Sequence, residues 1–247
     1  MSVGSKIKIC LIAVLGCSAV ALAQRPGWNF QGGFHGLFAG KVVTNEPYSG
    51  TGVTTRNQTL SNGNTINESN CVKVYRDAAG RTRREETRNS ATCSATPQSI
   101  LISDPVAGLQ YAINPQTSTY RQFTLKTPPA GTTPPTTTRP ANPNQVETSL
   151  GTETIPGTSL SAQGTQTVTT IPAGKFGNAQ PITITSVRWY SPDLQIVTQS
   201  SRTDPRSGVT SYQLTNVSTA EPAETLFQLP SGLTLQQGPS GRGRRAP

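Results

Sequence analysis

The chain of 247 residues carries 21 Lys and Arg against 12 Asp and Glu, which gives a formal net charge of +9. Its single histidine argues against a multi-histidine metal site and against a histidine-based catalytic triad. Hydrophobic residues make up 33% of the chain, so the core is lean and long stretches must lie outside it. The positive charge favours anionic surfaces as partners without specifying one.

Residues 1–23 have the pattern of an export signal. Lys6 and Lys8 precede an apolar run that ends in the small-residue cleavage pattern of Ala21 and Ala23. The run is shorter than the roughly 20 residues that a spanning helix needs. We therefore expect cleavage after Ala23, a periplasmic or secreted protein, and no transmembrane span in the mature chain.

Export also bears on the anchor and on the partners. In a minor alternative, Val14 to Cys17 is a lipidation box and Cys17 is the lipid-anchored first residue. An exported protein is not expected to bind nucleic acid. The Gly/Arg-rich C-terminal tail does not change this, because it lacks the aromatic platforms that nucleic-acid binding normally adds.

Three further segments surround or interrupt one expected domain. An antiparallel β domain is expected over 40–232, because strand and turn patterns recur at all-β spacing, and a Gly- and aromatic-rich segment at 24–39 precedes it. The stretch 127–144 is dominated by Pro, Thr and Gly and cannot bury enough surface to become ordered. We expect it to be a disordered loop, and 233–247 to be a disordered tail. The fold class is mainly β, a single antiparallel sheet with little helix.

Strands are expected early in the domain at Lys41–Tyr48, Gly52–Leu60 and Thr65–Arg76, the last two joined by an Asn-Gly turn. After the long loop, Thr-rich sequence from Ser149 to Ile171 predicts three short strands, with Gly164 as one of the breaks between them.

The stretch from Pro181 to Gly232 predicts a three-stranded antiparallel meander. β-branched and aromatic residues fill Ile182–Trp189, Leu194–Arg202 and Val209–Val217. The last two strands are separated by the turn Asp204–Gly208, where Asp, Pro and Gly stand at the positions that a tight turn requires.

Arg81–Arg88 is the most highly charged of the expected strands. Because strand side chains alternate, we expect one face to carry Arg81, Arg83 and Glu85 and the other to carry Arg84, Glu86 and Arg88. We interpret the segment as a solvated edge strand whose ion pairs discourage aggregation. The alternative is a basic patch that binds an anionic surface.

Cys71 and Cys93 are the two cysteines left after cleavage, and an oxidising compartment favours a disulfide between them. The bridge closes a loop of about 22 residues and is worth on the order of 3 kcal/mol. A simple hairpin register places Glu86 opposite Cys71, so the pairing requires the chain to bend after Arg88. A redox pair is the alternative, although the C-x-x-C spacing is missing.

The sequence shows no nucleophile elbow, phosphate-binding loop or metal-spaced run of carboxylates. Asp193 and Asp204 stand beside prolines at turns, where bonds to their own backbone explain them. We therefore expect a non-enzymatic protein without cofactor or metal. An enzyme that acts on cell-wall glycan is the remote alternative, and it would need two facing carboxylates.

Several motifs resemble the periplasmic lipoprotein-carrier (LolA-like) superfamily. In chain order they are Tyr75-Arg76-Asp77 with Arg81–Glu85, then Leu109–Pro115, then Trp189-Tyr190 with Asp204–Gly208, and finally Leu214–Val217 with Leu226–Pro230. The resemblance covers about Gly40 to Gly232, and the chain also resembles uncharacterised secreted bacterial proteins. It implies a strongly curved half-barrel whose concave face holds acyl chains or a partner polypeptide. The chain departs from the superfamily in lacking long helices to cap the sheet.

The expected function is that of an envelope protein that binds a lipid, a lipoprotein or an anionic envelope polymer. We expect the ligand to contact alternating apolar positions of the concave face, namely Tyr111, Ile113, Trp189, Leu194 and Ile196. In the structural alternative there is no ligand cavity, and the same residues close a core against the aromatic N-terminal segment.

Overall fold

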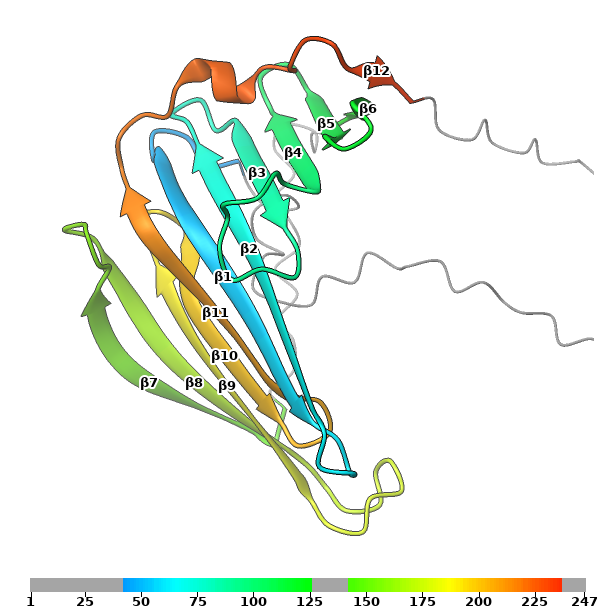
Figure 1. The fold of residues 1–247 in the computed structure, drawn as a ribbon. Coiled ribbons are helices and arrows are strands. Elements are labelled where there is room, and N and C mark those ends of the chain that lie inside the picture. The colour runs from blue at the N-terminus through cyan, green and yellow to red at the C-terminus, as the bar shows by residue number, and fades with distance from the viewer. Residues whose placement is uncertain (1–41, 126–141, 237–247) are drawn as a thin grey trace, which may run out of the picture. The chain divides into compact units, whose positions relative to one another are not determined.

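The computed structural model describes residues 42–125 and 142–236. The export signal, Cys17, the 24–39 segment, most of the Thr/Pro-rich loop and the end of the tail lie outside these ranges. The described part is one open, mainly antiparallel sheet with a single turn of 3-10 helix, and it curves along its length (Figure 1). The mainly β fold class with little helix is confirmed. No helix within the described ranges has both the length and the apolarity to cross a membrane.

The sheet has the spatial order β12-β6-β5-β4-β3-β2-β1-β11-β10-β9-β8-β7. Neighbouring strands are antiparallel except β12 and β6, which are parallel. The strands are β1 (Tyr48–Thr59), β2 (Thr65–Arg76), β3 (Thr82–Thr87), β4 (Ser99–Asp104), β5 (Leu109–Asn114), β6 (Thr119–Thr124), β7 (Gln145–Thr154), β8 (Ser161–Ile171), β9 (Ile182–Ser191), β10 (Ile196–Asp204), β11 (Gly208–Ser218) and β12 (Thr234–Leu235), and the 3-10 turn is η1 (Glu224–Phe227).

The meander of β9, β10 and β11 is confirmed, and its second turn shows why the sequence forms it. The Asp204 carboxylate accepts a hydrogen bond from the Arg206 backbone N–H at 3.0 Å. Gly208 has a φ of +82°, and a Cβ there would lie only 2.1 Å from the Asn57 carbonyl oxygen. Only glycine satisfies both conditions, so the chain reverses at this position.

The expected first strand was wrong, because residues 42–47 form a loop and β1 begins at Tyr48. Asn45 has a positive φ of 62° and donates its backbone N–H to the Ala78 carbonyl at 2.9 Å. Pro47 supplies no N–H for a strand ladder. The segment therefore packs on the β2–β3 turn instead of joining the sheet.

The three short strands expected between Ser149 and Ile171 are two longer ones, β7 and β8. Gly164 does not break β8 but pairs with Trp189 of β9. A Cβ at Gly164 would lie 2.6 Å from the Trp189 ring, so the missing side chain makes room for the indole.

The solvated-edge interpretation of Arg81–Arg88 was wrong, because β3 lies inside the sheet between β2 and β4. Arg83 is buried, and its Nε donates to a Glu85 carboxylate oxygen at 2.7 Å. The expected sharing of faces is confirmed, since Arg88 likewise contacts Glu86 at 3.4 Å. The Arg83–Glu85 pair neutralises charges in the interior of the sheet rather than protecting an edge, whereas Arg88 is exposed.

The C-terminal segment from Thr219 to Gln236, called the strap below, runs across the ends of β2 to β6 (Figure 1). It contains η1 and β12, so ordered structure continues past Gly232, where the domain was expected to end. The Thr234 backbone N–H donates to the carbonyl of Ser118, in the turn before β6, at 2.9 Å, and that of Gln236 donates to the carbonyl of Tyr120 in β6 at 2.8 Å. The strap thereby occupies part of the β6 edge.

The Cys71–Cys93 disulfide is confirmed, with a Cα–Cα distance of 5.3 Å. The expected register was shifted by one residue, because Thr87 and not Glu86 lies opposite Cys71. The expected bend is present: β3 ends at Thr87, and the loop that follows returns Cys93 to β2.

Candidate binding face

The pairing register assigns every strand residue to one of two faces, because directly paired residues of an antiparallel ladder point to the same side. One face, called the strap face, carries Cys71, Ile100 and Ile113. The opposite face is called the tyrosine face. Its central part consists of Tyr48, Val72, Val74, Arg84, Tyr212 and Leu214.

Two of the predicted ligand-binding residues, Tyr111 and Ile113, lie on the strap face. Ile113 forms a buried cluster with Ile100 and Ile102, and Tyr111 packs against it. Leu229 and Leu233 of the strap pack against the same cluster, a list of contacts typical of core packing.

Trp189 shares this face through its pairing with Gln199, but six strands separate its strand from β5. Leu194 and Ile196 are both buried, in the β9–β10 turn and at the start of β10. Leu194 also lines a pocket of about 200 Å³ together with Glu46 and Leu160. The structure therefore does not bring the five predicted residues into one site, and their role in binding stays a prediction.

The tyrosine face is closed at its centre by side chains that lean over β1. A Cβ at Gly52 would lie 2.6 Å from the Tyr212 ring, and one at Gly50 would lie 3.0 Å from Leu214. The two glycines let the side chains of β11 cross β1 and approach β2. As a result Tyr212, Leu214 and Val74 are all buried.

Arg76 places a charge at the edge of this apolar region. Its guanidinium lies 4.7 Å from the centre of the Tyr48 ring and donates to the carbonyls of Glu46 at 2.8 Å and Leu194 at 2.7 Å. Burial lowers the Arg76 pKa, while the nearby Tyr48 and Glu46 oppose that shift. Arginine nevertheless keeps its charge at neutral pH, so a buried cation stands beside the tyrosine face.

The two tyrosines are uncharged at neutral pH for the same physical reason. Burial raises the pKa of Tyr48 to about 12, against the opposing effect of Arg76 and Arg84. Burial also raises the pKa of Tyr212 and lowers that of Arg84. The face therefore combines aliphatic side chains with neutral phenols and guanidinium groups. Such a set can pack a hydrocarbon chain and donate hydrogen bonds to a carbonyl, carboxylate or phosphate.

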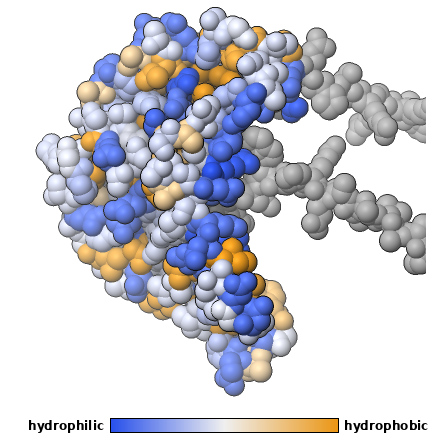
Figure 2. Space-filling view, viewed as in Figure 1, coloured by the Kyte–Doolittle hydropathy of each residue, from blue (hydrophilic) through white to orange (hydrophobic). Residues whose placement is uncertain are grey.

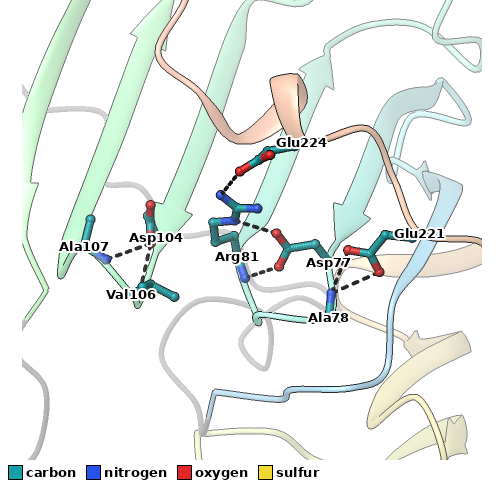
Figure 3. A network of polar contacts seen from close by, with 8 residues as sticks. All are labelled: Asp77, Ala78, Arg81, Asp104, Val106, Ala107, Glu221 and Glu224. Carbon is teal, nitrogen blue, oxygen red and sulfur yellow. Dashed lines mark hydrogen bonds and ion pairs between the residues drawn. The ribbon is translucent and has the colours of Figure 1, made fainter.

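A second polar network fastens the strap to the β2–β3 turn (Figure 3). The buried Asp77 carboxylate accepts from the backbone N–H and the guanidinium of Arg81. Arg81 also reaches Glu224 of the strap at 3.2 Å, and the Glu221 carboxylate accepts from the Ala78 backbone N–H at 3.1 Å. These charged groups form hydrogen bonds and ion pairs with one another and with the backbone of the turn, so the network has a structural role.

The remaining acidic candidates give no catalytic arrangement. Residues 42–125 and 142–236 contain no group of three or more His, Cys, Asp or Glu side chains that could hold a metal. Hydrogen bonds from Arg206, aided by Arg202, hold the pKa of Asp204 at about 2. The Asp204 carboxylate therefore forms its hydrogen bonds within the turn, as its position beside Pro205 indicated. Asp193 is exposed in the β9–β10 turn.

The tyrosine face could not be predicted from the sequence, for an identifiable reason. Tyr48 and Tyr212 are far apart in the sequence, and they share one face only because β1 pairs with β11. The available signal was the pair of glycines at 50 and 52 within a strand, which often marks a close approach by another group.

No family model and no curated protein matches this sequence. Among solved structures, the chain is similar to a chain of the Pseudomonas aeruginosa MucA/MucB complex, with 12% identity and a TM-score of 0.41 over 78% of this chain and 59% of that one. A LolA superfamily protein from Nitrosomonas europaea gives 10% identity and a TM-score of 0.32, over 76% and 92% of the two chains. A putative outer membrane lipoprotein-sorting protein domain from Vibrio parahaemolyticus gives 8% and 0.28, over 74% and 89%.

The chain thus spans about three fifths of the length of the MucA/MucB chain that it matches. Proteins of the LolA-like superfamily, which the motifs resemble, occur among these structures. At these identities and TM-scores the similarity carries no argument about function.

Proposed function

We propose that the protein is a non-catalytic binding protein of the cell envelope, and that its ligand is an acyl chain with a carbonyl or anionic head, as in a lipid or lipoprotein. The observation that carries the proposal is the composition of the tyrosine face. Val72, Val74 and Leu214 are aliphatic and adjacent across β2, β1 and β11, while the guanidinium of Arg76 and the ring of Tyr48 lie at the edge of the same region.

The chemistry of this face fits both ends of such a ligand. Each methylene moved from water onto the aliphatic residues contributes about 0.8 kcal/mol. A head group that reaches Arg76 gains a charge-assisted hydrogen bond, which is stronger than a neutral one. Export, which we expect from residues 1–23, would bring the chain to the envelope, where acyl ligands occur.

A structural role without ligand is the second candidate, and one observation favours it. Tyr48, Val74 and Leu214 are almost completely buried, as ordinary core residues are. Under this alternative the tyrosine face is permanent core, and substitutions on it change stability alone.

Native mass spectrometry of the protein exported into a bacterial envelope separates the two candidates. We expect acyl-chain adducts on the wild type that are lost in Leu214→Asp. Thr215→Asp is the matched control, because Thr215 is the exposed next residue of β11 and pairs on the opposite face.

Because Leu214→Asp risks unfolding, Tyr212→Phe provides a second test. This variant keeps the ring that covers Gly52 and removes only the hydroxyl. We therefore expect the fold to persist and the amount of bound acyl-chain adduct to fall, because one donor to the head group is lost. A wild-type protein free of acyl-chain adducts would support the structural role and reject the proposed binding role.

A further inference from the structure

The loop between β8 and β9, residues 172–181, has a defined conformation around Asn178. The Asn178 side chain accepts from the Phe176 backbone N–H at 3.1 Å and donates to two loop carbonyls at 3.0 and 2.7 Å. Its backbone carbonyl accepts from Gly174 N–H at 2.7 Å. This network fixes the shape of the loop without any contribution from the Phe176 ring.

Phe176 itself is 71% exposed, and the space around the loop is open. A Cβ at Gly174 or Gly177 would meet no atom within 4 Å. Packing within the described residues therefore does not account for an aromatic side chain at this position. A single exposed apolar residue is common on protein surfaces, so its surroundings must decide whether it has a role.

The surroundings form one end of the sheet, called the hairpin end. Pairing places the β8–β9 loop, the Asp204–Gly208 turn and the β1–β2 turn together there, because β9, β10, β11 and β1 are neighbours in register (Figure 1). Ile66, Val146 and Val209 are further exposed apolar residues of the strand ends in this region. Figure 2 shows apolar and hydrophilic side chains side by side at this end.

The charges of the hairpin end are mainly positive. Lys175 is exposed beside Phe176, and the side chains of Arg56, Arg202 and Arg206 are each about half exposed. Asp204, which neutralises part of this charge, is buried beneath the last two arginines. Two exposed carboxylates also lie in this region, Glu68, which is 3.9 Å from Arg56, and Glu147 of β7. The four basic groups outnumber them, so the outer surface presents an excess of guanidinium and ammonium groups around an aromatic tip.

We propose that the hairpin end binds the surface of a membrane that contains anionic lipids, with the Phe176 ring inserted at the headgroup level. Aromatic rings are favoured at the membrane interface, and each basic group near an anionic surface contributes about 1 kcal/mol. One ring and a few cations give weak, reversible binding of the kind that interfacial contacts produce. This site is separate from the tyrosine face and does not depend on the ligand proposed for it.

The geometry favours a lipid surface over a protein partner. Stable protein interfaces need a contiguous complementary patch, whereas the apolar residues of the hairpin end lie on different strands and on both faces of the sheet. A fluid bilayer can surround a projecting tip and does not require a flat patch.

The test is flotation of the full mature protein with vesicles of phosphatidylcholine, with and without phosphatidylglycerol. We expect binding only to the anionic vesicles, weakened about tenfold in Phe176→Ser by the lost apolar burial. Lys175→Gln should weaken it about fivefold through the lost charge. Val106→Ser is the matched control, because Val106 is 75% exposed in the β4–β5 turn at the other end of the strands, and it should bind like the wild type.

Three outcomes would overturn the proposal. If Phe176→Ser and Val106→Ser bound the anionic vesicles equally, the binding would arise from the overall positive charge of the chain and not from the Phe176 ring. Absence of binding to anionic vesicles would reject the membrane site directly. Capture of a protein by a photo-crosslinker at position 176, without vesicle binding, would assign the tip to a protein partner. Thermal unfolding of each variant verifies that the fold is retained.

Discussion

The two halves of the sheet are stabilised differently. In the strap half, β2 to β6, the strap packs against one face, and the fully buried Ile102 belongs to the cluster beneath it. In the open half, β7 to β10, the outermost strand β7 is exposed at nearly every residue. The comparison shows that strand length does not decide burial, since β7 is longer than β4 and yet far more exposed.

Within the open half, β7 relies on local β preference and backbone pairing, whereas Ala162, Ile184 and Ile196 of β8, β9 and β10 are buried. β8 is rich in Thr, whose branched side chain suits a partly buried strand. Substitutions should therefore have unequal effects in the two halves.

The largest expected effect comes from the same kind of change made in both halves. Ile102→Ala should lower the free energy of unfolding by about 4 kcal/mol, because it leaves a cavity in the buried cluster. Val146→Ala in β7, where the side chain is 63% exposed, should change it by less than about 0.5 kcal/mol. Urea denaturation measures both, and similar losses would remove the distinction between the halves.

Loss of the disulfide should cost slightly less. Replacing Cys71 and Cys93 by Ser removes the bridge between two residues that are 22 positions apart in the sequence. The unfolded chain then gains conformational freedom, and the protein should be destabilised by about 3 kcal/mol. Reductant should lower the melting temperature of the wild type and leave the double variant unchanged. If reductant changed the melting temperature of neither protein, the stability of the strap half would not depend on the bridge.

A smaller effect tests the open half through Asp204. Its pKa of about 2 lies below the ordinary value, so its stabilising contribution is present above about pH 4 and is lost as the pH falls through 2. Asp204→Asn should cost about 1 kcal/mol at neutral pH, a modest value because Arg206 is half exposed and screened. Stability curves of wild type and variant should converge in acid. A constant difference across that range would assign the loss to turn geometry alone.

The smallest effect at neutral pH concerns Tyr48, at the boundary between the halves. Its folded pKa is about 12, whereas an unfolded tyrosine ionises near 10. The wild type should therefore lose stability as the pH rises from about 10 towards 12, since the unfolded chain gains the ionised form first. Tyr48→Phe should lose less over that interval. Identical alkaline profiles would show that Tyr48 is not the group that titrates.

Local chemistry made part of the fold predictable. The Asp204–Gly208 turn, the strands on either side of it and the Cys71–Cys93 pairing all followed from residue types and compartment. In each case the deciding interaction lies within a few residues or depends on a covalent bond. Such features need no knowledge of distant strands.

Features that depend on distant segments were not predictable. Arg83 looked like an edge residue because its cover, the strap, lies far along the chain and accepts its hydrogen bond at the Leu226 carbonyl. Tyr111 and Ile113 were expected to contact a ligand, but the strap packs against their cluster. The tyrosine face escaped notice because β-strand pairing order cannot be read from strand patterns alone.

The central place of β1 also constrains how the chain acquires its fold. β1 pairs with β2, which follows directly, and with β11, which is made only after the whole β2–β10 stretch. A chain that emerges from its N-terminus must therefore keep one side of β1 unpaired until the C-terminal part arrives. Long-range strand pairing of this kind is slow, and an unpaired strand edge invites association with other chains. If synthesis stops before β11, the fragment keeps the β11-facing edge of β1 unpaired. We therefore expect such fragments to aggregate.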